Sequence, residues 1–169
     1  GCATSFRRGR FEFEVPLHQL SGIGSPDQAF TMRRMLEGLD VLDRLEFIEE
    51  PELYRAVVPG VLDVIIPADW AGAVAALTAA FPGNRERLER FFELVKTTTF
   101  WQIAARRGMP EEQIDEAYFR LALRPLREVL DEHFDDPGLK HTLAVYWTYL
   151  GQPPSVLSFQ DFAMTLFAY

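Results

Sequence analysis

The chain has 169 residues, of which 48% are hydrophobic and 25% are charged, and its formal net charge is −8. This length and composition are typical of a globular protein of about one domain. The acidic balance argues against nucleic acid as a partner, because nucleic-acid affinity comes largely from Lys and Arg side chains that neutralise phosphates. A single cysteine excludes a disulfide framework and a cluster of thiolate zinc ligands, and it fits a reducing, cytoplasmic compartment. No apolar run reaches the roughly 18 residues that a membrane span needs.

The first 24 residues begin with a predicted β-hairpin. Its turn is the basic segment Arg7–Arg10, in which Gly9 suits a backbone position with positive φ. The segment after the turn alternates apolar and polar side chains, which predicts a strand with one apolar face. The apolar members of this strand are Phe11, Phe13, Val15 and Leu17.

A short helix and a small antiparallel sheet are expected next. Ser25, Pro26 and Gln28 are typical of a capped helix start, and Gly38 is typical of a helix end. Strand character follows in three runs, which predict two or three strands, with a turn over 57–61 between the last two. The three runs are 44–49, 53–58 and 61–66.

From Pro67 onward the sequence predicts helices. Asp69, Asn84, Asp136 and the Ser158/Asp161 pair are candidate N-terminal caps, and Pro125 is expected to break a helix. The predicted helices cover 70–81, 85–106, 110–124, 126–134, 137–150 and 159–169. The fold class is therefore α+β. A strand-rich part at 1–66 is followed by a helical part at 67–169, and the two are expected to form one continuous unit because no linker separates them.

Few residues in the chain form a pattern that points to catalysis. His133 and His141 lack the spacing of a metal pair and are interpreted as structural or surface residues, whereas His18 ends the first predicted strand and is a candidate site residue. Cys2 is interpreted as a small apolar side chain rather than a nucleophile. The Gly22–Gly24 segment lacks the third glycine of a nucleotide-binding loop.

Aromatic side chains are more distinctive. The chain has 14 phenylalanines, and a dense aromatic stretch precedes the Gly-Gln-Pro-Pro break at 151–154. Helical spacing favours a role in the core for this stretch, and its aromatic density equally favours the wall of an apolar pocket. Its rings are Tyr146, Trp147 and Tyr149.

These stretches together resemble the FAD-dependent phytoene desaturase and retinol saturase family, which acts on carotenoids and retinoids. The resemblance is carried by the segment Gly1–Phe6, by the Phe-Glu-Phe-Glu strand with His18, and by three downstream segments. Those segments are 126–130, 134–137 and 149–155. Pro16 stands where the family usually has glycine, and Glu14 where it usually has aspartate.

The resemblance implies that the chain is an internal piece of a flavin enzyme, with the dinucleotide-binding motif before Gly1 and a second FAD-contacting segment after Tyr169. It implies hydride transfer between FAD and a polyene or isoprenoid substrate. By the same resemblance, Gly1, Cys2 and His18 are expected near the flavin. The isolated piece is not expected to retain FAD.

The resemblance also implies a tunnel for an apolar substrate. Aromatic side chains are expected to wall this tunnel. They are Phe100, Trp101, Tyr146, Trp147 and Tyr149.

Two other interpretations remain open. The chain is alternatively a non-enzymatic module that binds an apolar ligand or partner. It is alternatively a peripheral domain at a membrane surface, with the apolar helix expected at 159–169 as one element able to dock there.

Overall fold

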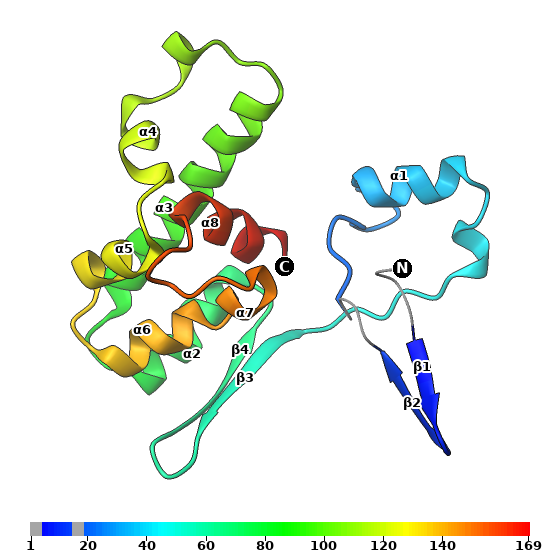
Figure 1. Cartoon of the computed structure of the whole chain (residues 1–169), viewed down its shortest axis with the longest axis horizontal. Helices are drawn as coiled ribbons and strands as arrows, with labels where there is room; N and C mark the ends of the chain where they lie inside the picture. Colours follow the sequence, from blue (N-terminus) through cyan, green and yellow to red (C-terminus); the bar gives the residue numbers. More distant parts are fainter. Residues whose placement is uncertain (1–4, 15–18) are drawn as a thin grey trace. The chain divides into compact units, whose positions relative to one another are not determined.

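The computed structural model describes residues 5–14 and 19–169, and these residues divide into two compact units. The first unit spans Gly1–Ile48 with Ala168–Tyr169, and the second spans Glu49–Phe167. The described residues form eight α-helices and two small antiparallel sheets of two strands each (Figure 1). The predicted α+β fold class is thereby confirmed.

The first unit opens with the expected hairpin. Strands β1 (Ser5–Arg8) and β2 (Phe11–Glu14) are antiparallel, with Phe6 opposite Phe13. Gly9 occupies the turn at φ 61°, in the left-handed region that glycine adopts at little cost. The predicted continuation of this strand to Leu17 lies outside the described residues.

The helix expected from Ser25 begins later, as α1 (Thr31–Gly38). The Ser25 hydroxyl accepts a hydrogen bond from the Gln28 N–H at 3.0 Å, and Gly24 forms an isolated β-bridge with Ala29. A local turn thus takes the backbone groups that an earlier helix start would use.

The strand predicted at 44–49 is wrong. Its first residue ends a 3₁₀ turn, η1 (Leu42–Arg44), and the rest of the run forms no strand in the structure. No strand among the described residues pairs with this run. The Arg33 guanidinium instead lies over the Phe47 ring, 5.4 Å from the centre of that ring.

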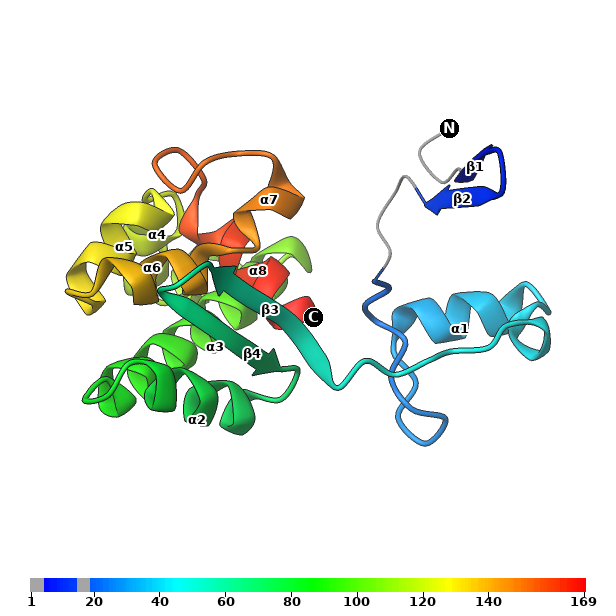
Figure 2. The ribbon, with the colours of Figure 1, turned by 90° about the horizontal axis from the view of Figure 1, so that it is seen from below.

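The second unit begins with the hairpin of β3 (Glu52–Val58) and β4 (Leu62–Pro67). Val58 faces Leu62 across the turn, where Gly60 has φ 75°. This confirms the strands expected at 53–58 and 61–66. Ile66 is buried and α2 (Trp70–Ala80) packs along β4 (Figure 2). The change from strands to helices near residue 67 therefore falls inside the second unit.

Helices α2 and α3 (Arg85–Arg106) lie close to their predicted ranges. The Asp69 carboxylate accepts the Gly72 N–H at 2.7 Å, as expected of an N-terminal cap. Asn84 does not cap α3 with its side chain, because its amide nitrogen donates to the Phe81 carbonyl at 3.1 Å instead.

The remaining helices are shorter than their sequence patterns suggested. The helix expected from Pro110 is a 3₁₀ turn, η2 (Glu111–Gln113), followed by α4 (Glu116–Ala122), in which the Asp115 carboxylate accepts the Ala117 N–H at 2.8 Å. The pattern at 137–150 is divided near Val145 into α6 (Pro137–Ala144) and α7 (Trp147–Leu150). The other two helices are α5 (Leu126–His133) and α8 (Phe159–Ala168).

The loop after α7 caps α5. The Leu126 N–H donates to the Leu157 carbonyl and the Arg127 N–H donates to the Pro154 carbonyl, each at 2.8 Å. These are N–H groups of the first turn of α5, which have no partner within the helix. The proline-rich break therefore stabilises the neighbouring helix.

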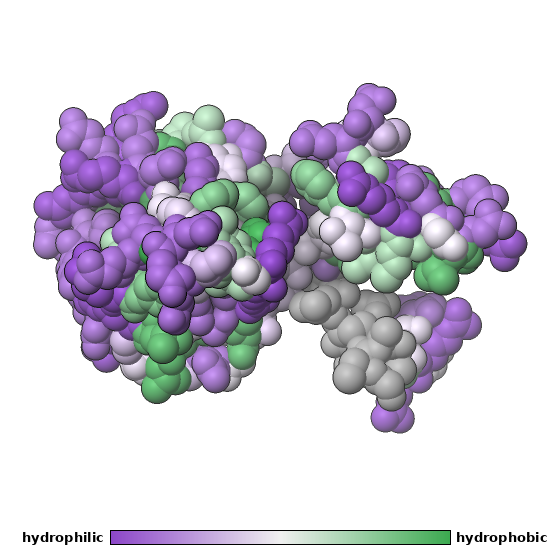
Figure 3. Space-filling view, turned by 90° about the horizontal axis from the view of Figure 1, so that it is seen from above, coloured by the Kyte–Doolittle hydropathy of each residue, from purple (hydrophilic) through white to green (hydrophobic). Residues whose placement is uncertain are grey.

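The core of the second unit is aromatic and lies between α3, α5 and α8. Phe91 is at its centre, with the rings of Phe92, His133, Phe134 and Phe159 at 5.4–6.2 Å. The apolar face of α8 is buried in this core, apart from Phe167. Hydrophilic side chains cover much of the surface of this unit, with hydrophobic patches between them (Figure 3). None of the helices in the described ranges has the length and apolarity that crossing a membrane requires.

Candidate functional site

Two of the predicted tunnel residues lie in the C-terminal half of α3. The Phe100 side chain is 58% exposed, and its ring meets Trp101 edge-on at 4.9 Å. Trp101 packs with Ala105 and Met109 against a small core cluster of Ile114, Tyr118 and Ala122. Phe100 is thus an apolar ring outside the core, whereas Trp101 packs α3 against α4.

The other three predicted residues lie at and after the break between α6 and α7. Tyr146 is buried, and its ring lies 5.6 Å from Tyr54 of β3 and 5.3 Å from Tyr149. Trp147 is exposed and Tyr149 is half-buried. The Tyr54 hydroxyl donates to the Thr142 carbonyl at 2.8 Å, and burial, followed by the nearby Tyr146, raises the pKa of Tyr54.

The five predicted aromatic residues therefore form two groups. Within the described residues, ring contacts join Phe100 to Trp101 and Tyr146 to Tyr149, and none joins one group to the other. The predicted cofactor-contacting residues Gly1, Cys2 and His18 lie outside the described residues.

A polar cluster between α3, α4 and α8 was missed at the level of sequence. With its side-chain oxygen and nitrogen exchanged, the orientation that satisfies both atoms, the buried Gln102 amide donates to the Gln160 backbone carbonyl at 3.0 Å and accepts from the Arg106 guanidinium at 3.2 Å. The Tyr118 hydroxyl donates to the Gln160 side-chain oxygen at 2.7 Å. Burial raises the pKa of Tyr118, with a smaller opposing effect from Arg106. The one sequence feature that could have indicated this cluster is Gln102, a glutamine on the mostly apolar face of a long helix.

The cluster ties α8 to both neighbouring helices. The first turn of α8 is fixed further by Ser158, whose hydroxyl contacts the Asp161 carboxylate at 2.6 Å and accepts the Asp161 N–H at 3.3 Å. The buried Thr99 hydroxyl has no hydrogen-bond partner among the described residues. Apart from Thr99, the arrangement pairs the buried Gln102 and Tyr118 with polar partners and holds helices together, which is a structural role.

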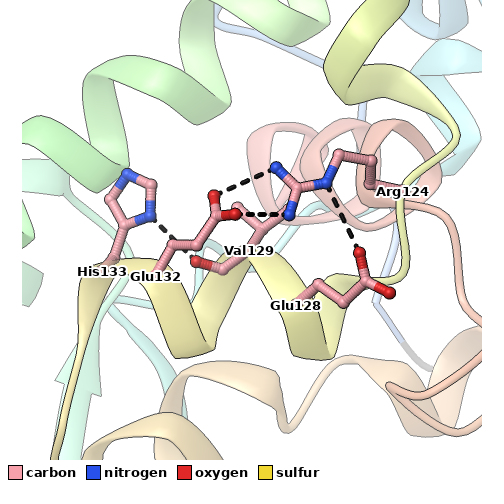
Figure 4. A network of polar contacts seen from close by, with 5 residues as sticks. All are labelled: Arg124, Glu128, Val129, Glu132 and His133. Atoms are coloured by element: carbon pink, nitrogen blue, oxygen red, sulfur yellow. Dashed lines mark hydrogen bonds and ion pairs between the residues drawn. The ribbon is translucent and has the colours of Figure 1, made fainter.

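A network of polar contacts runs along α5 (Figure 4). The Arg124 guanidinium binds both carboxylate oxygens of Glu132, at 3.0 and 2.6 Å, and lies 3.5 Å from Glu128. The His133 ring nitrogen Nδ1 lies 2.9 Å from the Val129 carbonyl. The hydrogen bond from Arg124 is the main cause that lowers the pKa of Glu132.

Two further pairs extend this network. Lys140 binds Asp131 at 2.5 Å and Arg87 binds Asp135 at 2.6 Å, and each hydrogen bond lowers the pKa of its carboxylate. These carboxylates are largely exposed, so each pair contributes little to stability by itself. The network holds α5 to α6, and it holds the loop after α5 to the start of α3.

Metal chemistry has no support in the described part of the chain, where no three side chains of His, Cys, Asp or Glu are placed to hold an ion together. A hollow of about 420 Å³ in the first unit is lined by Glu37, Asp40, Leu42 and Asp43. Its carboxylates are exposed to solvent, as on an ordinary acidic surface.

No protein-family model and no curated protein matches the chain.

Proposed function

We propose that the chain is part of an FAD-dependent oxidoreductase that transfers hydride to or from carbon–carbon bonds of a polyene or isoprenoid substrate. The observation that carries the proposal is the resemblance of the Gly1–Phe6 segment, the Phe-Glu-Phe-Glu strand and His18 to the phytoene desaturase and retinol saturase family. Bound flavin would supply the redox chemistry of such an enzyme, in which a carbon–carbon bond loses or gains a hydride together with a proton.

The part that this chain plays in the proposed reaction is to bind an apolar substrate. Long polyenes need aromatic and aliphatic walls, and they need few acid–base groups. Phe100 and Trp147 support this role, because both present large apolar rings at the surface of the second unit. Gly1, Cys2 and His18 would contact the flavin in the parent enzyme.

The coding sequence tests the enzyme class directly. We expect the codons before Gly1 to encode a strand, a Gly-x-Gly-x-x-Gly segment and a helix, followed by an acidic residue. An upstream reading frame without these features would overturn the flavin proposal.

Binding of all-trans-retinol tests the substrate class on the 169-residue chain. Retinol is expected to quench the tryptophan fluorescence in a saturable manner, and Phe100→Ser is expected to weaken binding by about tenfold through lost apolar contact. Phe119→Ser is the matched control, because Phe119 is an exposed phenylalanine on α4 outside the proposed wall. Unsaturable quenching, or equal loss in both variants, would contradict the proposal.

A second candidate function is a non-enzymatic module that binds an apolar ligand or partner. It is favoured by the first unit, where none of the residues at 5–13 and 19–48 is buried although many are apolar. The upstream coding sequence distinguishes the two candidates, because a module of this kind requires no dinucleotide-binding motif.

A further inference from the structure

The β1–β2 hairpin has two chemically different faces. Residues directly opposite each other in an antiparallel pair share a face, and successive residues alternate between faces. The pairs Phe6–Phe13 and Arg8–Phe11 therefore lie on one face, which we call the aromatic face. Arg7 and Glu12 pair on the other face, where the guanidinium and the carboxylate form an ion pair at 2.9 Å.

Two rings of the aromatic face are in contact with each other, and its rings remain exposed among the described residues. The Phe6 and Phe13 rings stack with their centres 5.0 Å apart and their planes 15° from parallel. Even so, Phe6 and Phe13 are each 45% exposed and Phe11 is 57% exposed. Three large apolar rings at one hairpin are unusual on the surface of a protein that binds nothing there.

Two cations flank these rings. The Arg8 guanidinium lies 5.9 Å from the Phe6 ring centre, and the Arg10 guanidinium lies 5.1 Å from that of Phe11. Neither arginine has a carboxylate partner among the described residues, in contrast to Arg7. The aromatic face therefore combines apolar surface with positive charge that is not neutralised within the hairpin.

We propose that the aromatic face of the β1–β2 hairpin docks on an anionic lipid membrane. The interface of a bilayer offers phosphate and carboxylate groups to Arg8 and Arg10, and it offers the acyl boundary to the phenylalanine rings. Nucleic acid fits less well, because two unpaired arginines neutralise few phosphates and offer the phenylalanine rings no acyl boundary. The proposal rests on the hairpin alone and is independent of the proposed flavin chemistry.

The face is small, so the predicted binding is weak and dependent on charge. Each arginine near an anionic membrane contributes about a fivefold increase in partitioning, and added salt screens this contribution. A partly inserted phenylalanine contributes about tenfold. Both contributions are therefore needed for measurable association.

The test is flotation of the 169-residue chain with phosphatidylcholine vesicles that contain phosphatidylserine. We expect the chain to float with these vesicles at low salt, and to remain unbound to vesicles of phosphatidylcholine alone or at high salt. The Arg8→Gln/Arg10→Gln variant and the Phe11→Ser variant are each expected to lose at least nine tenths of the association. Circular dichroism of each variant checks that the fold is retained.

Two controls make the result specific to this face. Arg34→Gln/Arg44→Gln removes the same charge from exposed positions of the same unit, and Val61→Ser removes an 82%-exposed apolar side chain from the other hairpin. Both are expected to bind as the unchanged chain does. Equal loss in the controls, no flotation, or tighter binding to a single-stranded oligonucleotide than to the vesicles would overturn the proposal.

Discussion

Phe91 and Phe100 lie on the same helix, and the structure assigns them opposite roles. Phe91 is fully buried, with neighbouring rings supplied by α5 and α8. Phe100 is mostly exposed and contacts Trp101. The same truncation to alanine should therefore have very different effects on stability at the two positions.

The expected magnitudes follow from burial. Phe91→Ala removes a ring at the centre of the core and leaves a cavity that the surrounding aromatic rings fill only in part, so we expect a loss of about 4 kcal/mol in the free energy of unfolding. Phe100→Ala leaves no cavity, and we expect a loss of less than about 1 kcal/mol. Phe91→Leu keeps most of the volume and should lie between the two.

Urea denaturation followed by tryptophan fluorescence measures these differences. All three tryptophans, Trp70, Trp101 and Trp147, belong to the second unit, so the signal reports the unit that contains both substitutions. Similar losses at Phe91 and Phe100, or a loss below about 1 kcal/mol at Phe91, would show that the assignment of the core is wrong.

Three further predictions concern polar groups and backbone geometry. The pKa values of Asp131 and Glu132 are lowered in the folded state by hydrogen bonds from Lys140 and Arg124, so their contribution to stability is present above about pH 4 and is lost as pH falls through the lowered values. The Asp131→Asn/Glu132→Gln variant should accordingly lose less stability between about pH 5 and pH 2 in urea titrations, and an unchanged slope would contradict this. Asp136 accepts the N–H groups of the first turn of α6 at 2.7 and 3.1 Å, and Asp136→Ala should cost about 1 kcal/mol in the same assay, with Asp136→Asn close to neutral. A Cβ on Gly24 would lie 2.2 Å from the Gln28 carbonyl oxygen, whereas a Cβ on Gly9 would meet nothing within 4 Å. Gly24→Ala should therefore accelerate amide hydrogen exchange in residues 19–38, and Gly9→Ala should leave the exchange in that range unchanged.

Local signals predicted much of the fold. The hairpin at Gly9 follows from alternation after a glycine turn, and the hairpin at Gly60 follows from β-branched runs on either side of one. Helix α3 follows from a long apolar face that ends before Gly108. In each of these cases, neighbouring residues in sequence determine the backbone conformation. The start of α1 was predicted too early because Ser25 forms a turn with Gln28 in place of a helix cap.

The break between α6 and α7 could not be predicted because its cause is distant in sequence. No proline or glycine lies between Thr142 and Tyr146. The Thr142 carbonyl, which accepts an intrahelical bond in a continuous helix, accepts the hydroxyl of Tyr54 from β3. The polar cluster around Gln102 was missed for the same reason, since its partners come from three helices.

Burial determines which of the predicted tunnel residues can be tested by substitution. Tyr146 packs against Tyr54 in the interior, so its replacement would disturb the β3 contact and would change stability and ligand binding together. Phe100 and Trp147 are exposed, and a change in ligand binding at either position would therefore report contact with the ligand. The aromatic stretch after α6 thus contains a core residue, Tyr146, and a candidate ligand contact, Trp147. Its sequence allowed both a core role and a role in the wall of a pocket. Phe100 and Trp147 are the positions at which the proposed function can be refuted without unfolding the second unit.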